Sequence, residues 1–245
     1  MENSVIITGA NRGMGSKMMT RFAEGGYKKI WACARQESDC FLEQIHNVSA
    51  QYDCDITPIY FDLADEEEIT KAVRTIRAEK MSIDALVNVA GVVNTDMFFM
   101  TSMKKLREVF ETNFFGTVCF TQLILKLMLR QKEGSIVNIA SIAGLDANPT
   151  NCAYGSSKAA LISLSRILAS EVGEQGIRVN VIAPGPTDTD MVIRVREKVG
   201  ENLLNNCAMN RLGQPEEIAN VAFFLASKQA SFINGQVIRV DGGSK

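Results

Sequence analysis

The segment Thr8-Gly9-Ala10-Asn11-Arg12-Gly13-Met14-Gly15 is the most informative stretch of this 245-residue sequence. The apolar run Val5–Thr8 leads into it, and a helical pattern starts at Ser16. Glycines at a strand-to-helix turn let the backbone approach a phosphate, and the free N–H groups and dipole of the new helix attract its charge. A glycine-rich turn without a ligand is the alternative. The position between a first strand and a first helix favours a loop that binds the pyrophosphate of a dinucleotide, with GxxxGxG spacing in place of GxGxxG.

Short apolar and β-branched runs recur along the rest of the chain, separated by helical patterns. Their nearly continuous apolar character is typical of strands buried on both faces of a parallel sheet. No linker or repeat divides the sequence. We therefore predict one α/β domain over residues 1–245, a doubly wound Rossmann domain with a seven-stranded parallel sheet and helices on both faces. The predicted strands are Ser4–Thr8, Ile30–Arg35, Ile56–Phe61, Ala85–Ala90, Ser135–Ser141, Ile177–Ala183 and Gln236–Val240.

Three of the helical segments carry local signals of their own. Asp65 and Glu68 resemble a capping box at the start of one helix. Asp62, at the tip of the strand before it, either accepts the adenine amino group or caps that helix. Pro215 suits the first turn of another helix, because a proline there loses no intrahelical hydrogen bond. Leucines at helical spacing over 161–168 predict a third.

The composition is that of an ordinary soluble protein, with 46% hydrophobic residues, 22% charged residues and a formal net charge of −2. This balance gives no sign of a nucleic-acid surface or a polybasic membrane contact. No apolar stretch approaches membrane-spanning length, since Lys126 interrupts even Leu123–Leu129. The chain starts without a basic region before its apolar run, so we expect a cytoplasmic protein.

The cysteines and the histidine exclude several kinds of site. The cysteines contain no CxxC pair, which favours free thiols in a reducing compartment over disulfides or zinc. The one histidine, His46, lies in a polar helical stretch away from the other motifs. A Ser-His-Asp triad or a His-based metal site therefore has almost nothing to be built from, and we predict no metal. The six cysteines are Cys33, Cys40, Cys54, Cys119, Cys152 and Cys207.

The end of the second predicted strand bears on the choice of dinucleotide. It carries Arg35 and lacks an acidic residue at its tip, the residue type that holds a ribose 2′-hydroxyl in NAD-binding domains. The planar fork of Arg35 suits a phosphate, and Arg12 of the glycine loop is expected to reach the same group. Two solvated surface arginines are the alternative, and Glu37 and Asp39 just beyond could serve a ribose. The pair of arginines favours NADP(H).

A second constellation follows the fifth strand. Ser141 closes that strand, and Tyr154-Gly155-Ser156-Ser157-Lys158 opens the next helix with its tyrosine and lysine one turn apart on one face. Lowering a phenol pKa from about 10 to about 7 requires about 4 kcal/mol. An ammonium about 4 Å away supplies a similar amount at an effective dielectric of about 20. We predict that Tyr154 donates a proton, that Lys158 lowers its pKa, and that Ser141 polarises a carbonyl beside it.

Together these motifs resemble the short-chain dehydrogenase/reductase family over essentially the whole chain. The family's Asn-Asn-Ala-Gly motif appears as Asn88-Val89-Ala90-Gly91, with valine for the second asparagine, and its Pro-Gly motif as Pro184-Gly185. The resemblance implies the catalytic residues Asn113, Ser141, Tyr154 and Lys158. It implies that the cofactor contacts Gly9, Asn11, Arg12, Gly13, Met14, Gly15, Arg35, Asp62, Leu63, Asn88, Ala90, Gly91, Tyr154, Lys158, Pro184, Gly185, Thr187 and Thr189.

The resemblance also implies a reaction. NADPH delivers hydride to a carbonyl carbon held by Ser141 and Tyr154, and Tyr154 gives its proton to the forming alkoxide. Lys158 holds the nicotinamide ribose, and Asn113 positions a water that returns protons through Lys158. The cofactor implied is NADP(H), and the substrate is a small carbonyl compound or an acyl thioester.

Within the family, the sequence is most similar to 3-oxoacyl-[acyl-carrier-protein] reductases, notably over 210–219 and 235–243. That similarity implies fatty-acid biosynthesis, with acyl carrier protein as a partner. The arginines that these reductases place before the fifth strand and late in the catalytic helix correspond here to Ser135 and Ser170, which counts against carrier recognition. Many relatives acting on other alcohols share the tail. A dehydrogenase of sugars, steroid-like or small keto compounds, or a non-catalytic dinucleotide sensor, is therefore the alternative.

Residues 186–210 are expected to form a substrate lid. Its apolar and basic side chains suit an apolar substrate with an acidic appendage, and a simple amphipathic helix has the same pattern. Family members are commonly tetramers through helices around Lys104–Lys132 and Cys152–Glu174 and through the final strand, so we expect a homotetramer or a homodimer. The lid residues in question are Met191, Val192, Arg194, Val195, Arg196, Lys198, Val199, Leu203 and Leu204.

Overall fold

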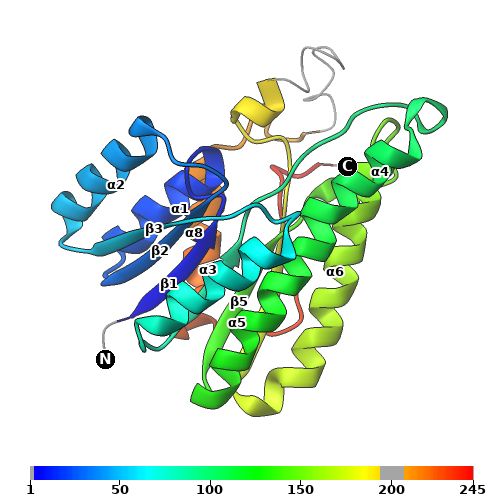
Figure 1. Cartoon of the computed structure of the whole chain (residues 1–245). Helices are drawn as coiled ribbons and strands as arrows, with labels where there is room; N and C mark the ends of the chain where they lie inside the picture. The colour runs from blue at the N-terminus through cyan, green and yellow to red at the C-terminus, as the bar shows by residue number, and fades with distance from the viewer. Residues whose placement is uncertain (1–2, 194–206, 245) are drawn as a thin grey trace.

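The computed structural model describes residues 3–193 and 207–244, in which seven parallel strands form one sheet in the order β3-β2-β1-β4-β5-β6-β7 (Figure 1). The order reverses between β1 and β4, where a doubly wound sheet has its ligand crevice. The predicted seven-stranded parallel sheet is confirmed. Its strands are β1 Ser4–Thr8, β2 Lys29–Ala34, β3 Asp55–Tyr60, β4 Ala85–Asn88, β5 Gly134–Ile139, β6 Ile177–Pro184 and β7 Val237–Val240.

Helices cover both faces of the sheet. On one side pack α1, α2 and α8, and on the other α3, α5 and α6 (Figure 1). The helices are α1 Gly13–Glu24, α2 Asp39–Tyr52, α3 Glu66–Ala78, α4 Met103–Phe110, α5 Thr117–Gln131, α6 Cys152–Val172 and α8 Pro215–Ala226. Shorter turns are η1 Phe98–Met100, the π-helical η2 Glu111–Gly116, η3 Ile142–Gly144, η4 Gly173–Gln175 and η6 Lys228–Ala230.

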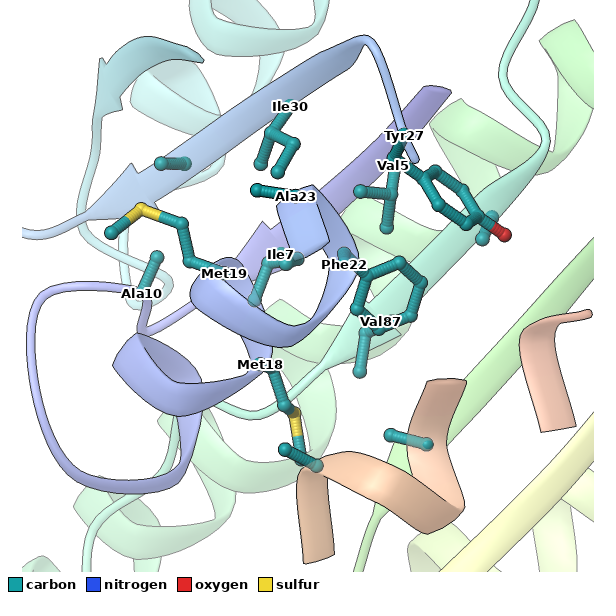
Figure 2. Close-up of a cluster of buried hydrophobic side chains, with 14 of the residues drawn as sticks. Val5, Ile7, Ala10, Met18, Met19, Phe22, Ala23, Tyr27, Ile30 and Val87 are labelled. Atoms are coloured by element: carbon teal, nitrogen blue, oxygen red, sulfur yellow. The ribbon is translucent and has the colours of Figure 1, made fainter. Parts of the chain in front are cut away.

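The central strand shows how the sequence builds two cores at once. Successive side chains of a strand point to opposite faces, so Val5 and Ile7 enter the core under α1 while Ile6 enters the core under α3 and α5. Figure 2 shows the first of these cores, where Met18 and Phe22 of α1 lie over the strands. All five of these side chains are fully buried, which explains why the strand reads as an unbroken apolar run.

The local signals of the helices are mostly confirmed. The Asp65 carboxylate accepts hydrogen bonds from the backbone N–H groups of Glu67 and Glu68, so Asp65 is the N-cap of α3. The predicted capping box is incomplete, because the Glu68 carboxylate accepts from the backbone of Asp62 rather than from that of Asp65. Pro215 is the first residue of α8, as its missing N–H favours.

One helical stretch is longer than the sequence indicated. Met103–Gln131 runs without a break through α4, η2 and α5, and by length and composition it could cross a membrane. The expectation that no segment approaches that length is therefore wrong for this stretch. Phe120, Ile124 and Met128 of α5 are fully buried in the core of the sheet, which is the packing of a core helix.

A buried lysine stabilises the sheet at the amino ends of β2 and β3. Lys29 opens β2, and its Nζ donates to Asp55 Oδ2 at 2.7 Å, to Thr57 Oγ1 at 2.7 Å and pairs with Glu79 Oε2 at 2.6 Å. Its side chain is only 5% exposed. Three acceptors for its three donors explain why a charged residue is tolerated there.

We expect Lys29→Met to lower the free energy of unfolding by about 2 kcal/mol, because hydrogen bonds to charged groups contribute about 1.5–3 kcal/mol. Urea unfolding would measure this. The matched control is Lys28→Met, which breaks the exposed ion pair with Asp53 and should change stability little. Equal effects of the two substitutions would contradict the structural role given to Lys29.

Candidate functional site

A cavity of about 800 Å³ opens at the carboxyl ends of β1 to β4, where the strand order reverses. Its position and size suit a dinucleotide-sized ligand. Of the predicted cofactor residues, those that line it are Gly9, Asn11, Arg12, Gly13, Met14, Gly15, Arg35, Asp62, Leu63, Ala90, Gly91 and Thr189. Those that do not are Asn88, Tyr154, Lys158, Pro184, Gly185 and Thr187.

The glycine loop is held tightly against β4. Gly9 has a φ of 67°, and an added Cβ would lie 3.0 Å from the Cα of Ala90. Thr8 Oγ1 accepts hydrogen bonds from the backbone N–H groups of Val89 and Ala90 at 2.9 and 3.1 Å. Val89 therefore uses only its backbone in this contact, and valine in place of the family's asparagine leaves it intact.

The start of α1 has the features of an anion site. Arg12 is its N-cap residue, yet its side chain makes no capping hydrogen bond, and the first turn contains no acidic residue. An unopposed helix N-terminus that faces a cavity attracts negative charge. The glycine loop thus fits the pyrophosphate of a dinucleotide.

Both arginines predicted to select the nucleotide lie at the cavity. Arg12 and Arg35 are exposed and line it, and within the described residues neither forms an ion pair with a carboxylate. Glu37 lines the same end of the cavity, whereas Asp39 is the first residue of α2 and does not. Arg12 and Arg35 thus stand at this end of the cavity beside the carboxylates of Glu37 and Asp62, and neither arginine is paired with them.

Asp62 does not cap helix α3, which was one of its two possible roles. Asp62 Oδ1 accepts a hydrogen bond from the backbone N–H of Ala64 at 2.9 Å, which closes a local turn, and Asp65 caps α3. Asp62 lines the cavity. Its second carboxylate oxygen is therefore the candidate acceptor for an adenine amino group.

Asn88 lies beneath the cavity and belongs to a buried polar network. Its Nδ2 donates to Thr121 Oγ1 at 2.9 Å and to Asn138 Oδ1 at 2.8 Å. Asn138 in turn donates to Ser165 Oγ at 2.8 Å. The network joins β4, β5, α5 and α6, so Asn88 supports the cavity floor through these elements.

The catalytic candidates come together at the start of α6. Ser141 lies two residues beyond β5 and is the N-cap of η3, where its Oγ accepts from the N–H of Ala143 at 3.1 Å. The Tyr154 hydroxyl forms a hydrogen bond with Ser141. Lys158, one helical turn further on, is 3% exposed and donates from Nζ to the carbonyl of Ile139 at 2.8 Å. The spatial grouping expected from the sequence is present, although Ser141 stands in a turn and not in the strand.

The predicted electrostatics of this group need correction. Burial raises the pKa of Tyr154, although the hydrogen bond with Ser141 acts in the opposite direction. Burial lowers the pKa of Lys158 to about 8. The Nζ of Lys158 lies 5.9 Å from the centroid of the Tyr154 ring, so the two side chains are neighbours on one face of α6. Among the protein's own groups, burial is the larger influence on the pKa of Tyr154 and Ser141 the smaller, opposing one.

Asn113 lies in the π-helical turn η2, a helix form that is frequent at functional sites. Its Oδ1 accepts from the N–H of Val92 at 2.8 Å, and its Nδ2 donates to the carbonyl of Val92 and to Ser157 Oγ. A Cβ added to Gly91 would lie 3.1 Å from Asn113 Oδ1 and 3.4 Å from Lys158 Nζ. Gly91 therefore stands between the cavity and the polar ends of both residues.

The region after β6 is only partly described. Gly185 donates its N–H to the carbonyl of Val240 at 3.0 Å, and Thr187 Oγ1 donates to the carbonyl of Gly185 at 3.0 Å. Thr189 and Met191 line the cavity. The predicted lid covers residues 186–210, of which 194–206, with its basic side chains, lie outside the described residues.

Two features of the site were not predicted. Ser157 fixes Asn113, and a polar residue on the buried face of α6 was the available signal. Ser135, used above to assess carrier recognition, is buried in β5 and donates to the carbonyl of Leu225 at 3.0 Å. The hydroxyl of Ser135 is therefore engaged inside the sheet, and this residue presents no positive charge to a carrier protein. Ser170 is exposed.

Comparisons with known proteins find relatives that match nearly the whole chain. A family model described as enoyl-(acyl carrier protein) reductase matches residues 9–245. A 3alpha-hydroxysteroid dehydrogenase from Mediterraneibacter gnavus is 33% identical over 100% of this chain and 98% of its own. A 3-oxoacyl-[acyl-carrier-protein] reductase from Aquifex aeolicus is 35% identical over 97% of this chain and 95% of its own. The structure of ElxO with NADP bound has a TM-score of 0.89 at 29% identity, covering 99% of this chain and 98% of that chain.

Proposed function

The chain belongs to the short-chain dehydrogenase/reductase family, a family of dinucleotide-dependent oxidoreductases, and from this we propose that it is an NADPH-dependent carbonyl reductase. The observation that carries the proposal is the grouping of Ser141, Tyr154 and Lys158 at the start of α6, with the Nζ of Lys158 next to Gly91 of the cavity wall. These residues are a hydroxyl pair able to hold a carbonyl oxygen and a buried base able to exchange a proton.

Each residue of this group has its own role in the proposed reduction. When bound, NADPH supplies a hydride. Ser141 and Tyr154 hold the carbonyl oxygen of the substrate, and Tyr154, whose raised pKa keeps it protonated at neutral pH, gives up its proton to that oxygen. Lys158, with a pKa lowered to about 8, is close enough to neutrality to return a proton toward the phenol, and Asn113 keeps the neighbouring turn in place.

The choice of NADP(H) over NAD(H) rests on Arg12 and Arg35, two exposed guanidinium groups that line the cavity without a carboxylate partner among the described residues. The relative ElxO, with NADP bound, is consistent with this choice. A 2′-phosphate meets two guanidinium groups there, and each charge-assisted hydrogen bond contributes about 1.5–3 kcal/mol.

We expect Arg35→Asp to raise the KM for NADPH about 100-fold, because the new carboxylate repels the 2′-phosphate. The KM of the variant for NADH should become equal to or lower than its KM for NADPH, because the carboxylate accepts a hydrogen bond from the ribose hydroxyl. Initial rates with both nucleotides would measure the change. Arg74→Asp, at an exposed position of α3 that does not line the cavity, is the control and should leave the preference unaltered. An unchanged NADPH preference in Arg35→Asp would show that the arginines are solvated surface residues.

For the substrate we propose a 3-oxoacyl thioester, on the similarity to the Aquifex aeolicus reductase and on the apolar side chain of Met191 at the cavity. The similarity to a 3alpha-hydroxysteroid dehydrogenase favours a second candidate, a secondary alcohol on a larger apolar body. NADPH oxidation should therefore be assayed with acetoacetyl thioesters, with and without acyl carrier protein, and with a panel of steroid, sugar and small ketones. Turnover of thioesters alone supports the first candidate. Absence of turnover with every compound, while NADPH still binds, would support a dinucleotide sensor instead.

A further inference from the structure

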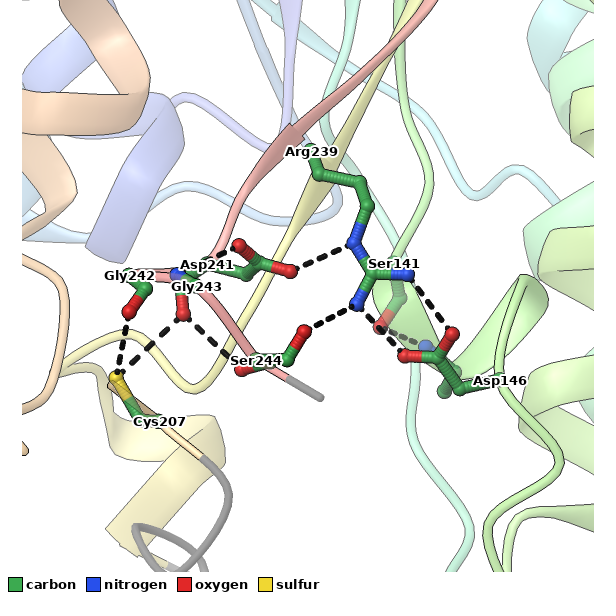
Figure 3. A network of polar contacts seen from close by, with 9 residues as sticks. Ser141, Asp146, Cys207, Arg239, Asp241, Gly242, Gly243 and Ser244 are labelled. Atoms are coloured by element: carbon green, nitrogen blue, oxygen red, sulfur yellow. Dashed lines mark hydrogen bonds and ion pairs between the residues drawn. The ribbon is translucent and has the colours of Figure 1, made fainter. Parts of the chain in front are cut away.

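A single guanidinium on the last strand joins the turn that carries Ser141 to the C-terminal turn (Figure 3). Arg239 in β7 donates from Nη1 and Nη2 to the two carboxylate oxygens of Asp146 at 2.8 and 2.9 Å. Its Nε donates to Asp241 Oδ2 at 2.7 Å, and Nη2 also donates to the carbonyl of Ser244 at 3.2 Å. The planar guanidinium group of Arg239 thus binds two carboxylates and a carbonyl that come from two separate segments.

On one side of Arg239 lies the Ser141 turn. Asp146 ends this turn, and its backbone N–H donates to the carbonyl of Ile142 at 2.8 Å. The turn rests directly on the catalytic helix, since a Cβ added to Gly144 would lie 2.9 Å from the backbone carbon of Lys158. A displacement of Asp146 therefore shifts Ser141 relative to α6.

On the other side lies the C-terminal turn. The Asp241 side chain is only 8% exposed, and a Cβ added to Gly185 would lie 2.8 Å from the Cα of Asp241. The same turn receives Cys207 and Met209, through a bridge between Cys207 and Ser244 and a hydrogen bond from Met209 N–H to the carbonyl of Gly242 at 3.0 Å. Arg239 therefore connects the Ser141 turn with both ends of the segment that follows β6.

We propose that Arg239 is a positioning residue, which keeps the Ser141 hydroxyl in register with Tyr154 by holding Asp146 against the C-terminal turn. The proposal rests on the function proposed above. It requires an arginine, because a lysine offers one compact ammonium and cannot bind Asp146 through two parallel hydrogen bonds while it also holds Asp241.

Kinetics give the first test. Arg239→Met and Asp146→Asn should each lower kcat for carbonyl reduction by about tenfold or more, since a small misplacement of a reacting group can cost about 100-fold. The Kd for NADPH should stay unchanged, because neither residue lines the cavity. Arg239→Lys should recover only part of the rate. The double variant should be no slower than the slower single variant, because the two residues act as one unit.

Hydrogen exchange gives a second test that needs no turnover. In the full-length protein, Arg239→Met should accelerate amide exchange in residues 141–146 and 207–209. Lys28→Met, which breaks an ion pair at the opposite edge of the sheet, should not. Unchanged exchange in both segments, or a wild-type kcat in Arg239→Met, would overturn the positioning role. If the wild-type protein reduces no carbonyl but Arg239→Met still exchanges faster in these segments, the connection through Arg239 stands and the proposed function is refuted.

Discussion

Tyr154→Phe is expected to lower kcat for carbonyl reduction by about 100- to 10,000-fold, the usual contribution of a positioned proton donor. The phenyl ring fills the same space, so the fold and the cavity should be preserved. What is lost is the hydroxyl that forms the hydrogen bond with Ser141 and carries the transferable proton. Stopped-flow or steady-state oxidation of NADPH at 340 nm measures the change, and a fluorescence titration should give an unaltered Kd for NADPH.

The control for this substitution is Tyr27→Phe. Tyr27 is also a buried tyrosine, and burial raises the pKa of its phenol to about 12, but it lies in the core under α1 near the start of β2 (Figure 2). Removal of the Tyr27 hydroxyl should leave kcat unchanged. If Tyr154→Phe kept a rate close to wild type, proton donation by Tyr154 would be excluded.

Gly15→Ala is expected to weaken NADPH binding by about 100-fold, equivalent to about 2.7 kcal/mol. The added Cβ would fall 2.1 Å from the carbonyl oxygen of Gly9 and 2.7 Å from its carbon. Both are backbone atoms, so the clash can be relieved only if the loop moves away from α1. Such overpacking costs about 1–3 kcal/mol, and the displaced N–H groups would no longer converge on a phosphate.

The expected loss can be separated from a general effect of adding a methyl group. Gly213→Ala is the comparison, because a Cβ there would come no closer than 3.7 Å to any atom. Calorimetric titration of both variants with NADPH, alongside their melting temperatures, measures binding and stability independently. Wild-type affinity in a folded Gly15→Ala protein would show that the glycine loop does not contact the dinucleotide.

Sequence patterns located most of this architecture because the deciding signals are local. Apolar runs identified all seven strands to within one or two residues, and Asp65 and Pro215 marked helix starts that the structure confirms. The glycine loop and the Tyr154–Lys158 pair were recognisable for the same reason, since each is contained in one strand-to-helix turn or one helical turn.

Properties that depend on distant residues could not be predicted in this way. The pKa of Tyr154 depends on how completely the surrounding elements exclude water, and that burial reversed the predicted direction. Asp146 and Arg239 are 93 positions apart, and no local pattern announces their contact. The continuity of α4 with α5 depends on the π turn at Asn113, which propensities do not specify.

The location of the Lys29 cluster has a practical consequence for engineering. Every strand runs the same way, so the buried lysine with Asp55 and Glu79 is separated by the length of the sheet from the loops that build the cleft. Changes at sites that share no neighbours combine almost additively. Thermal robustness can therefore be altered at one rim of this scaffold and substrate preference at the other, and the two sets of substitutions can be optimised in separate libraries before they are merged.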